Sequence, residues 1–516
     1  MSNTKTIAKN TGWYGLETGI AAVVTIFTSI AIARVLGPSK MGYVVYVSWI
    51  ASMTASLGGI GVPATTRKYM AEFLGMGDRA TARLIYIRTL VLQAGMASLA
   101  TVLVLIWVVT DAQPGYKLAS ILIVLSIWPS MVNSISAQAN VAAEELWANL
   151  PASVMSTFTF FAVIAATVVF KWGILGVGAS MLSMRLVDFL VRFFPTLKRI
   201  RSWESHTQSP EGLDKRMTTF ALQSVATMIL SLIVWERSEF FLLKYLCADV
   251  RQIAFYSVAF SLADRLMVGS QVFGSATGAT IFAQYGRDRS RLPAITAATF
   301  RYIALISMPL HFIAAALAAP ALLLLYGNQY VGAAAVVSLA PLLCMPKAFL
   351  GPVESLLQST EMQNWIIIST VAAGVIDIGV AAYLIPKYGA VGACIGSGAA
   401  QIVAVGIMWA LGIYLFNVKL PWLQLAKITV ISGLAALAAH FISSALGPLW
   451  GILCGGSAAL AILIALCYML RVLEPEDQAR FRVLSKMLPK RMTRPAERLV
   501  SWMTRPTLSA VAPPGA

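Results

Sequence analysis

Long apolar runs follow one another along almost the whole chain, separated by short polar connections. Most are close to the 20 residues that an α-helix needs to cross a bilayer. They lack the polar–apolar alternation of membrane β-barrel strands. The pattern predicts an all-α integral membrane protein with about fourteen spans, at 13–34, 42–63, 85–110, 118–139, 151–170, 174–195, 218–243, 253–281, 301–326, 331–356, 365–385, 390–416, 426–446 and 449–470.

The composition agrees with this interpretation. The 516 residues are 58% hydrophobic and only 12% charged, with a mean hydropathy of +0.76. A soluble core does not need that much apolar surface. In a soluble protein the net charge of +17 would suggest a nucleic-acid partner. Here the positive residues lie mostly in connections on one side of the membrane, so no nucleic acid is expected.

The basic residues predict the orientation. With the N-terminus in the cytoplasm, 27 of the 39 lysines and arginines lie in inner segments or at the inner ends of spans, and 7 in outer segments or at the outer end of a span. Cytoplasmic loops carry such an excess, so both termini are predicted inside, in a multi-pass protein of the cytoplasmic membrane. The first apolar run follows Lys5 and Lys9 and lacks a small-residue cleavage site, so it is expected to stay as a span.

An internal repeat links the two halves of the chain. "FKWGILGVGAS" at 170–180 follows the fifth span, and "PKYGAVGACIG" at 386–396 follows the eleventh, 216 residues later. Matches at nearly constant offset favour a duplicated six-span unit with both copies in the same orientation. The predicted organisation is a six-helix lobe at 1–213, a second at 214–417, two added spans at 418–472 and a basic cytoplasmic tail at 473–516.

Two motifs resemble a known family. "ARVLGPSKMGYV" at 33–44 ends a Trp-containing first span, and "LGGIGVPATTRKYMAE" at 57–72 closes the second. Both resemble the polysaccharide transporters, the Wzx-type flippases of the multidrug/oligosaccharidyl-lipid/polysaccharide exporter superfamily. The resemblance implies two six-helix lobes around a central cavity. It also implies transport of a polyprenyl-pyrophosphate-linked oligosaccharide from the inner to the outer leaflet, for polysaccharide biosynthesis.

Cations within the spans are the candidate substrate residues, because intramembrane charges are costly and usually face a cavity or a partner. Arg185, Asp188 and Arg192 share one helix face. Arginine presents paired donors to phosphate oxygens, so a cavity lined by such groups suits a pyrophosphate. The alternative is structural pairing with nearby acids. The cavity candidates are Arg34 at the outer end of the first span, Arg185, Arg192, Arg237, Arg265 and Lys347.

Acidic residues within the spans are candidates for ion coupling or for pairing inside the cavity. Glu17, Glu354 and Asp377 have no obvious neighbour of opposite sign, and an unpaired carboxylate in a low-dielectric site has a raised proton affinity. A neutral carboxyl bonded to the next helix is the other interpretation. The same set includes Asp188, Glu236, Glu239 and Asp264, which lie next to cations in the sequence.

The sequence contains no recognisable catalytic machinery. It has no P-loop, no HExxH and no paired CxxC, and its five cysteines are interpreted as packing residues. No catalytic residue, metal or cofactor is therefore expected, and the protein is not expected to be an enzyme. A flippase working by alternating access is the function predicted. Its partners would be the lipid-linked oligosaccharide, membrane lipids, and the polymerase and glycosyltransferases of the same pathway.

Three alternatives stay open. A cation-coupled small-molecule or drug antiporter of the same superfamily would favour intramembrane acids, and the cations argue against it. A lipid II flippase is a related variant. An integral-membrane polysaccharide polymerase or ligase belongs to another class, and the short outer connections argue against it.

Overall fold

The computed structural model describes most of the chain. It covers residues 2–111, 115–204, 210–235, 238–268, 288–360 and 362–473, with a few positions between 269 and 287. Within the helices, it does not describe the side chains of 2–26, 28, 111, 146, 223, 226–235 and 363. Every regular element in this part of the chain is helical, which confirms the predicted fold class.

The N-terminal half begins with α1 (Ser2–Leu57), which consists of two helices joined at Gly37, where φ is 69° and ψ 170°. Only glycine adopts such a backbone readily, so Gly37 separates the first two predicted spans. The helices that follow are α2 (Val62–Gly75), α3 (Arg79–Asp111), α4 (Lys117–Leu125), α5 (Ile127–Ala142), η1 (Leu146–Asn149), α6 (Leu150–Phe170), α7 (Gly173–Arg201), α8 (Leu213–Trp235) and α9 (Glu239–Leu246).

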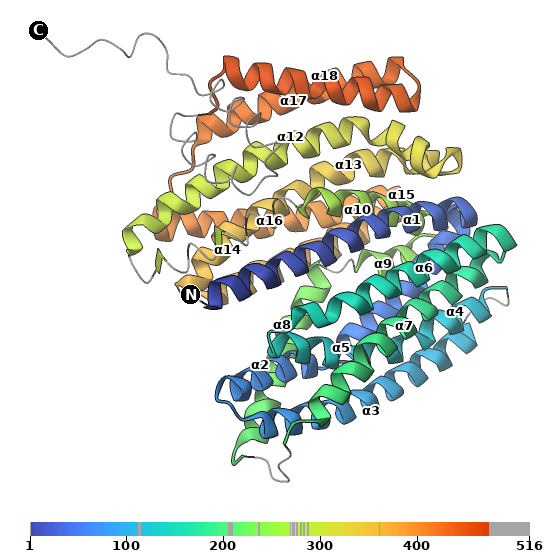
Figure 1. Cartoon of the computed structure of the whole chain (residues 1–516). Coiled ribbons are helices and arrows are strands. Elements are labelled where there is room, and N and C mark those ends of the chain that lie inside the picture. The colour runs from blue at the N-terminus through green and yellow to red at the C-terminus, as the bar shows by residue number, and fades with distance from the viewer. Residues whose placement is uncertain are drawn as a thin grey trace, which may run out of the picture. The chain divides into compact units, whose positions relative to one another are not determined.

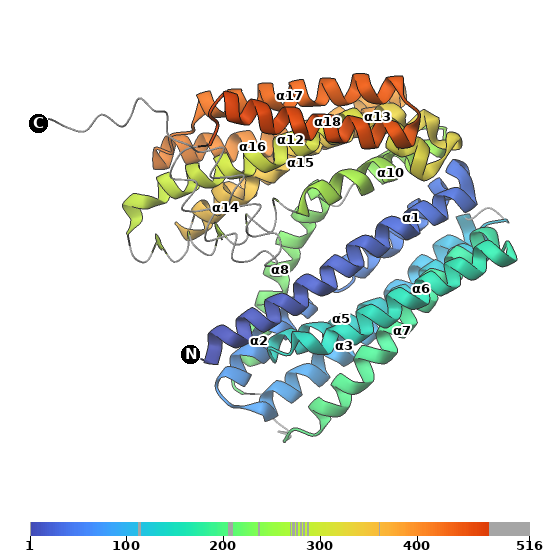
Figure 2. The same cartoon turned by 45° about the horizontal axis from the view of Figure 1, so that its top comes forward.

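The C-terminal half continues the helical pattern (Figure 1). Its described elements are α10 (Arg251–Leu266), η2 (Arg289–Arg291), α12 (Leu292–Tyr326), η3 (Asn328–Ala333), α13 (Ala334–Cys344), η4 (Met345–Phe349), α14 (Leu350–Ser359), α15 (Gln363–Tyr388), α16 (Ala390–Phe416), α17 (Trp422–Ala445) and α18 (Pro448–Met469). Figure 2 shows α6 beside α7 and α17 beside α18, the two most extensively packed helix pairs.

All fourteen predicted spans coincide with helix, wholly or in part. Ten described helices are long and apolar enough to cross a membrane, or eleven when the pair Ser29–Leu57 and Val62–Gly75, bent by 41°, is counted as one. The smaller number refers to the described residues alone. The seventh span includes residues 236 and 237, and the eighth runs beyond α10 into 269–287, which are not or only partly described.

Connections predicted on the inner side meet in the structure. Arg216 Nη2 lies 2.8 Å from Glu72 Oε1, which joins the sixth-to-seventh connection to the second-to-third. Arg83 Nη1 donates to the Trp203 carbonyl at 2.6 Å between the same two connections. Because these two connections lie together, the chain between them crosses the membrane an even number of times, as the four predicted spans require.

Connections predicted on the outer side meet as well. The rings of Tyr43 and Tyr116 lie 4.7 Å apart, which joins the first-to-second connection to the third-to-fourth. The Ala390 amide donates to Gln252 Oε1 at 3.0 Å and joins the eleventh-to-twelfth connection to the seventh-to-eighth. Which of the two sides is cytoplasmic stays a prediction from the basic residues.

The two reversals that revealed the repeat share their backbone geometry. Gly173 has a φ of 56° and is the first residue of α7, and Gly389 has a φ of 55° and directly precedes α16. A Cβ on Gly176 would lie 2.2 Å from Thr167 Oγ1, and one on Gly392 would lie 2.5 Å from the Leu384 carbonyl. Both glycines therefore permit close packing of the two helices that the reversal joins.

By contacts, the chain forms two compact units. One comprises Met1–Ser261, Tyr326–Val336 and Thr370–Ala400, and the other Leu262–Leu325, Val337–Ser369 and Gln401–Ala516. These units come from packing and the lobes from sequence repetition, so the repeat boundary at 213/214 stays a prediction. The first unit has a core around Tyr69, Tyr86 and Ile135, and the second a core around Phe349 and Ile431.

Candidate functional site

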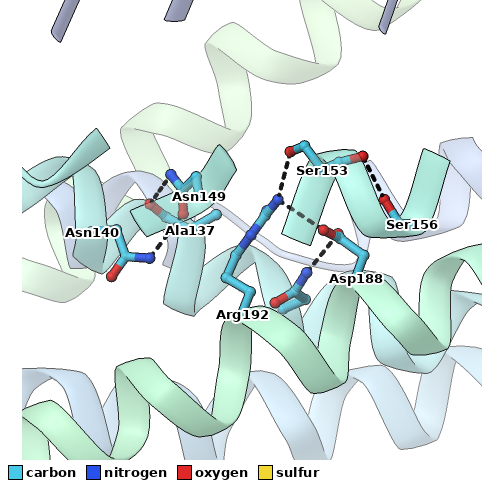
Figure 3. Close-up of polar contacts among 8 residues, drawn as sticks. Ala137, Asn140, Asn149, Ser153, Ser156, Asp188 and Arg192 are labelled. Carbon is cyan, nitrogen blue, oxygen red and sulfur yellow. Dashed lines mark hydrogen bonds and ion pairs between the residues drawn. The ribbon is translucent and has the colours of Figure 1, made fainter. Parts of the chain in front are cut away.

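A polar network joins α5, α6 and α7 inside the first unit (Figure 3). Arg192 Nη2 lies 2.8 Å from Asp188 Oδ1, one turn away on α7, and also donates to Ser153 Oγ on α6 at 3.1 Å. Asn133 on α5 donates to the second Asp188 oxygen at 2.7 Å. The side chains of Arg192 and Asp188 are only 12% and 14% exposed. The network thus fixes both charges against neighbouring helices.

Arg185 lies on the same polar face of α7 but outside this network. No hydrogen bond or ion pair joins Arg185 to any described residue, and its side chain is exposed. The structural alternative had paired Arg185 with Asp188. In the structure Asp188 forms its ion pair with Arg192, and its charge also acts on Arg185, with which it forms no ion pair.

Although the Arg185 side chain is exposed, it does not lie on the apolar side of α7. An apolar stripe of exposed side chains on α7 comprises Leu186, Leu190 and Phe194. At 100° per residue this stripe is centred about 140° around the helix from Arg185. Arg185 therefore lies on the polar face of an amphipathic helix, at a position where a guanidinium group is available to a ligand.

A second network of polar side chains lies one turn further along α7. Asn140 Oδ1 accepts hydrogen bonds from Thr196 at 3.2 Å and from Arg199 at 2.7 Å, and its amide nitrogen donates to Asn149 at 2.8 Å. Arg199 also forms an ion pair with Glu145. Sequence analysis missed these residues, because buried asparagine carries no charge pattern. The network joins the ends of α5, η1 and α7.

Two acidic residues meet in the interior of the first unit. Asp377 on α15 and Glu239 at the start of α9 are each only 1% exposed. The Asp377 carboxyl lies beside the side chains of Glu239 and Ser238. From the sequence, Asp377 has no obvious neighbour of opposite sign; among the described residues its charged neighbour is a second carboxyl. This contact joins helices 138 positions apart in the sequence, so the sequence pattern did not show it.

Four further candidates lie in the second unit. Arg265 is half-buried on α10, and its Nε atom has no hydrogen-bond partner among the described residues. Asp264 is exposed beside it, and Lys347 is half-buried in η4. Glu354 on α14 accepts a hydrogen bond from Gln358 at 3.1 Å. This last contact agrees with a carboxyl held by a local partner.

Four other candidates lie on α1 or outside the described residues. Arg34 is exposed on α1, three residues before the break at Gly37. Glu17 belongs to α1, but its side chain lies outside the described residues, as do Glu236 and Arg237 entirely. In the described part of the chain no group of three or more His, Cys, Asp or Glu side chains is arranged to hold a metal ion.

Comparisons with solved structures show the fold. A lipid II flippase, MurJ, in an inward closed conformation aligns with a TM-score of 0.68 at 14% identity, covering 89% of this chain and 98% of that one. An inward-facing multidrug resistance MATE transporter of the MOP superfamily aligns at 0.62 and 15%, covering 79% and 96%. A MOP superfamily transporter from Pyrococcus furiosus aligns at 0.54 and 15%, covering 82% and 96%.

Sequence comparison adds the family. No curated protein matches the chain. The model of a family described as "Polysaccharide biosynthesis protein" matches residues 31–335, which include α2 to α10, α12 and the networks on α7. The match extends over more than half of the chain, and the chain therefore belongs to the polysaccharide biosynthesis protein family.

Proposed function

We propose that this protein is a flippase that moves a polyprenyl-pyrophosphate-linked oligosaccharide from the inner to the outer leaflet of the cytoplasmic membrane by alternating access. The observation that carries the proposal is the combination of this family with a transporter fold. Polysaccharide biosynthesis at a membrane requires that a sugar built on a lipid carrier cross the bilayer. A polytopic helical protein with the fold of known flippases and exporters fits this transport step better than an enzymatic reaction.

The arrangement on α7 supports an anionic lipid-linked substrate. A pyrophosphate cannot enter a low-dielectric path without compensation of its charge. Arg192 is neutralised by Asp188, whereas Arg185 on the same face forms no hydrogen bond or ion pair with a described residue and has only a longer-range interaction with the Asp188 charge. We assign Arg185 as a pyrophosphate ligand and Arg192 as a residue that positions α7. Arg34, Arg237, Arg265 and Lys347 stay predictions from the sequence as further substrate ligands.

The test compares Arg185→Ala, Arg185→Lys and Arg192→Ala in cells that lack the native gene. Arg185→Ala should lower surface polysaccharide at least about tenfold, since a charge-assisted bond to phosphate contributes ~1.5–3 kcal/mol. Its level in the membrane should not change, because no described contact is lost. Arg185→Lys should restore part of the export. Wild-type export by Arg185→Ala would contradict the assignment.

We further propose that the carboxyl pair of Glu239 and Asp377 couples transport to a cation or a proton. Two carboxylates in contact in a buried site cannot both be ionised without compensation, because like charges repel strongly in a low dielectric. The pair therefore holds a proton or takes a cation. Binding of either would change the contact between α9 and α15, the kind of change that can bias one transporter conformation over another.

A small-molecule antiporter is the second candidate function, because the fold is shared with MATE transporters and the carboxyl pair could bind a cation there too. Reconstituted protein separates the two. A flippase should move a fluorescent polyprenyl-pyrophosphate sugar between leaflets and leave a cationic dye gradient unchanged. Dye transport without lipid-linked sugar movement would favour the antiporter.

A further inference from the structure

A basic pocket lies in the first unit and includes none of the residues of the networks on α7. It has a volume of about 340 Å³ and is formed by α2 and the first two turns of α8. Lys68, Lys215 and Arg216 contribute its charge, and Tyr69 and Phe220 its aromatic wall. These residues belong to the connections predicted to lie on the inner side of the membrane.

The pocket has a rigid wall. Tyr69 is only 2% exposed and belongs to the core of the first unit, and Phe220 packs against that core. The two rings meet edge to face with their centroids 6.0 Å apart. Aromatic rings held this way give the pocket a fixed shape in the free protein, which lowers the entropic cost of binding a ligand.

The cations at this end of the unit divide into two groups. Four arginines have protein partners: Arg83 with the Trp203 carbonyl, Arg88 with Asp214, Arg199 with Glu145 and Arg216 with Glu72. These contacts hold the helix ends together. The two lysines of the pocket belong to the other group.

Neither lysine of the pocket pairs with a described carboxylate. Lys68 Nζ lies 4.0 Å from the Phe220 ring centroid and 5.1 Å from that of Tyr69. Lys215 is exposed and makes no hydrogen bond or ion pair with a described residue. The pocket thus holds two cations that the fold does not neutralise, beside a third, Arg216, that Glu72 holds in place.

The pocket's position identifies the class of ligand. The second span is predicted to end at residue 63 and the seventh to begin at residue 218. The pocket residues therefore lie at or just beyond the membrane boundary, at the depth of lipid headgroups. Basic pockets between helices at the cytoplasmic boundary bind phosphate-bearing headgroups, and the inner leaflet supplies anionic lipids. A volume near 340 Å³ matches a headgroup rather than a chain of sugars.

We propose that this pocket binds the phosphate of a lipid headgroup, with Lys68 and Lys215 as its charged ligands and the rings of Tyr69 and Phe220 as its wall. The proposal does not rest on the transported substrate, because the pocket is separate from the residues assigned to transport. Two kinds of lipid carry this chemistry, an anionic phospholipid and a polyprenyl pyrophosphate.

The experiment measures binding by titration calorimetry on the purified full chain in detergent. The probes are a short-chain phosphatidylglycerol and farnesyl pyrophosphate, each titrated into wild type, Lys68→Gln/Lys215→Gln and a control. The control is Lys198→Gln/Arg201→Gln, which removes two exposed cations from the end of α7 outside the pocket. All three proteins should melt at similar temperatures, since neither pair of side chains forms an ion pair with a described carboxylate.

Wild type should bind at least one probe, and the pocket variant should bind it about tenfold or more weakly, at roughly 1 kcal/mol for each lysine lost. The control should bind like wild type. Binding of phosphatidylglycerol alone would identify a membrane phospholipid as the occupant, and binding of farnesyl pyrophosphate alone a carrier lipid. No binding by wild type, or the same weakening in the variant and the control, would overturn the proposal.

Discussion

Arg192 and Asp188 lie one helical turn apart on α7, and their charged groups are 2.8 Å apart with both side chains largely buried. This ion pair distinguishes Arg192 from Arg185, two arginines that look equivalent in the sequence. Arg192 is satisfied within the protein, and Arg185, two turns earlier on the same face, is available to a ligand. This distinction leads to opposite expectations for the two residues.

Asp188→Asn should destabilise the protein without changing any residue assigned to the substrate. The substitution leaves the charge of Arg192 buried and uncompensated, which costs about 3 kcal/mol for a buried pair. We expect a lower melting temperature in detergent and less protein in the membrane. Arg185→Ala is the matched control, and it should melt like wild type. A larger loss of stability in Arg185→Ala than in Asp188→Asn would contradict this division of roles.

Gly389→Ala and Gly173→Ala should differ in stability although both glycines have nearly the same φ. A residue with a side chain costs roughly 1–2 kcal/mol in this left-handed conformation at either position. At Gly173 the added Cβ meets nothing within 4 Å, but at Gly389 it would lie 2.6 Å from Gln252 Oε1. Gln252 would have to move and lose its bond to the Ala390 amide, at about 1 kcal/mol more.

Thermal melting of the two glycine variants measures this difference, and a third variant tests its cause. In a Gln252→Ala background the two glycine substitutions should cost about the same, because the obstructing side chain is gone. An equally large difference in that background would show that something other than Gln252 distinguishes the two reversals.

Asp377→Asn should reduce the dependence of transport on the coupling ion. With one carboxyl replaced by a neutral amide, Glu239 no longer repels a like charge, so the site has less need of a proton or cation. We expect flipping in proteoliposomes to become insensitive to an imposed proton or sodium gradient. Glu354→Gln is the control and should keep the wild-type response, since its carboxyl has its own partner in Gln358. An unchanged response in Asp377→Asn would remove the pair from the mechanism.

The outer connection between α9 and α10 should contribute to stability in a pH-dependent way. Arg251 Nε lies 2.9 Å from Asp249 Oδ1, and this bond holds the pKa of Asp249 below its usual 3.8. A lowered folded-state pKa means that the contribution is complete above the usual carboxyl range and is lost as the pH falls through the lowered value. Asp249→Asn should therefore melt below wild type at neutral pH.

The difference in melting temperature between wild type and Asp249→Asn should shrink as the pH is lowered below about 4, toward the lowered pKa. Arg251→Gln should show the same convergence, since it removes the other half of the bond. A difference that stays constant from pH 7 to the acid end would mean that Asp249 acts through something other than its charge.

The hydrophobic pattern alone predicted the helical membrane class, because a bilayer admits little else from apolar runs of this length. The repeat was also visible, since the reversal at Gly173 and Gly389 needs glycine and leaves the same residue type in both copies. The tertiary structure confirmed the helical class, and the duplication stays a prediction. The division into spans at Gly37 follows from the same backbone requirement.

Only the tertiary structure decided which charges are partners. Charge spacing on one helix suggested that Arg185 pairs with Asp188. In the structure Asp188 forms an ion pair with Arg192, and polar groups of α5 and α6 form hydrogen bonds with this pair. Asp377 and Glu239 are far apart in the chain, so nothing local predicts their contact. The sequence determined which charged residues lie within the predicted spans. Packing between helices determined which of them are compensated, because compensation depends on distances of a few ångströms across elements that the sequence does not order in space.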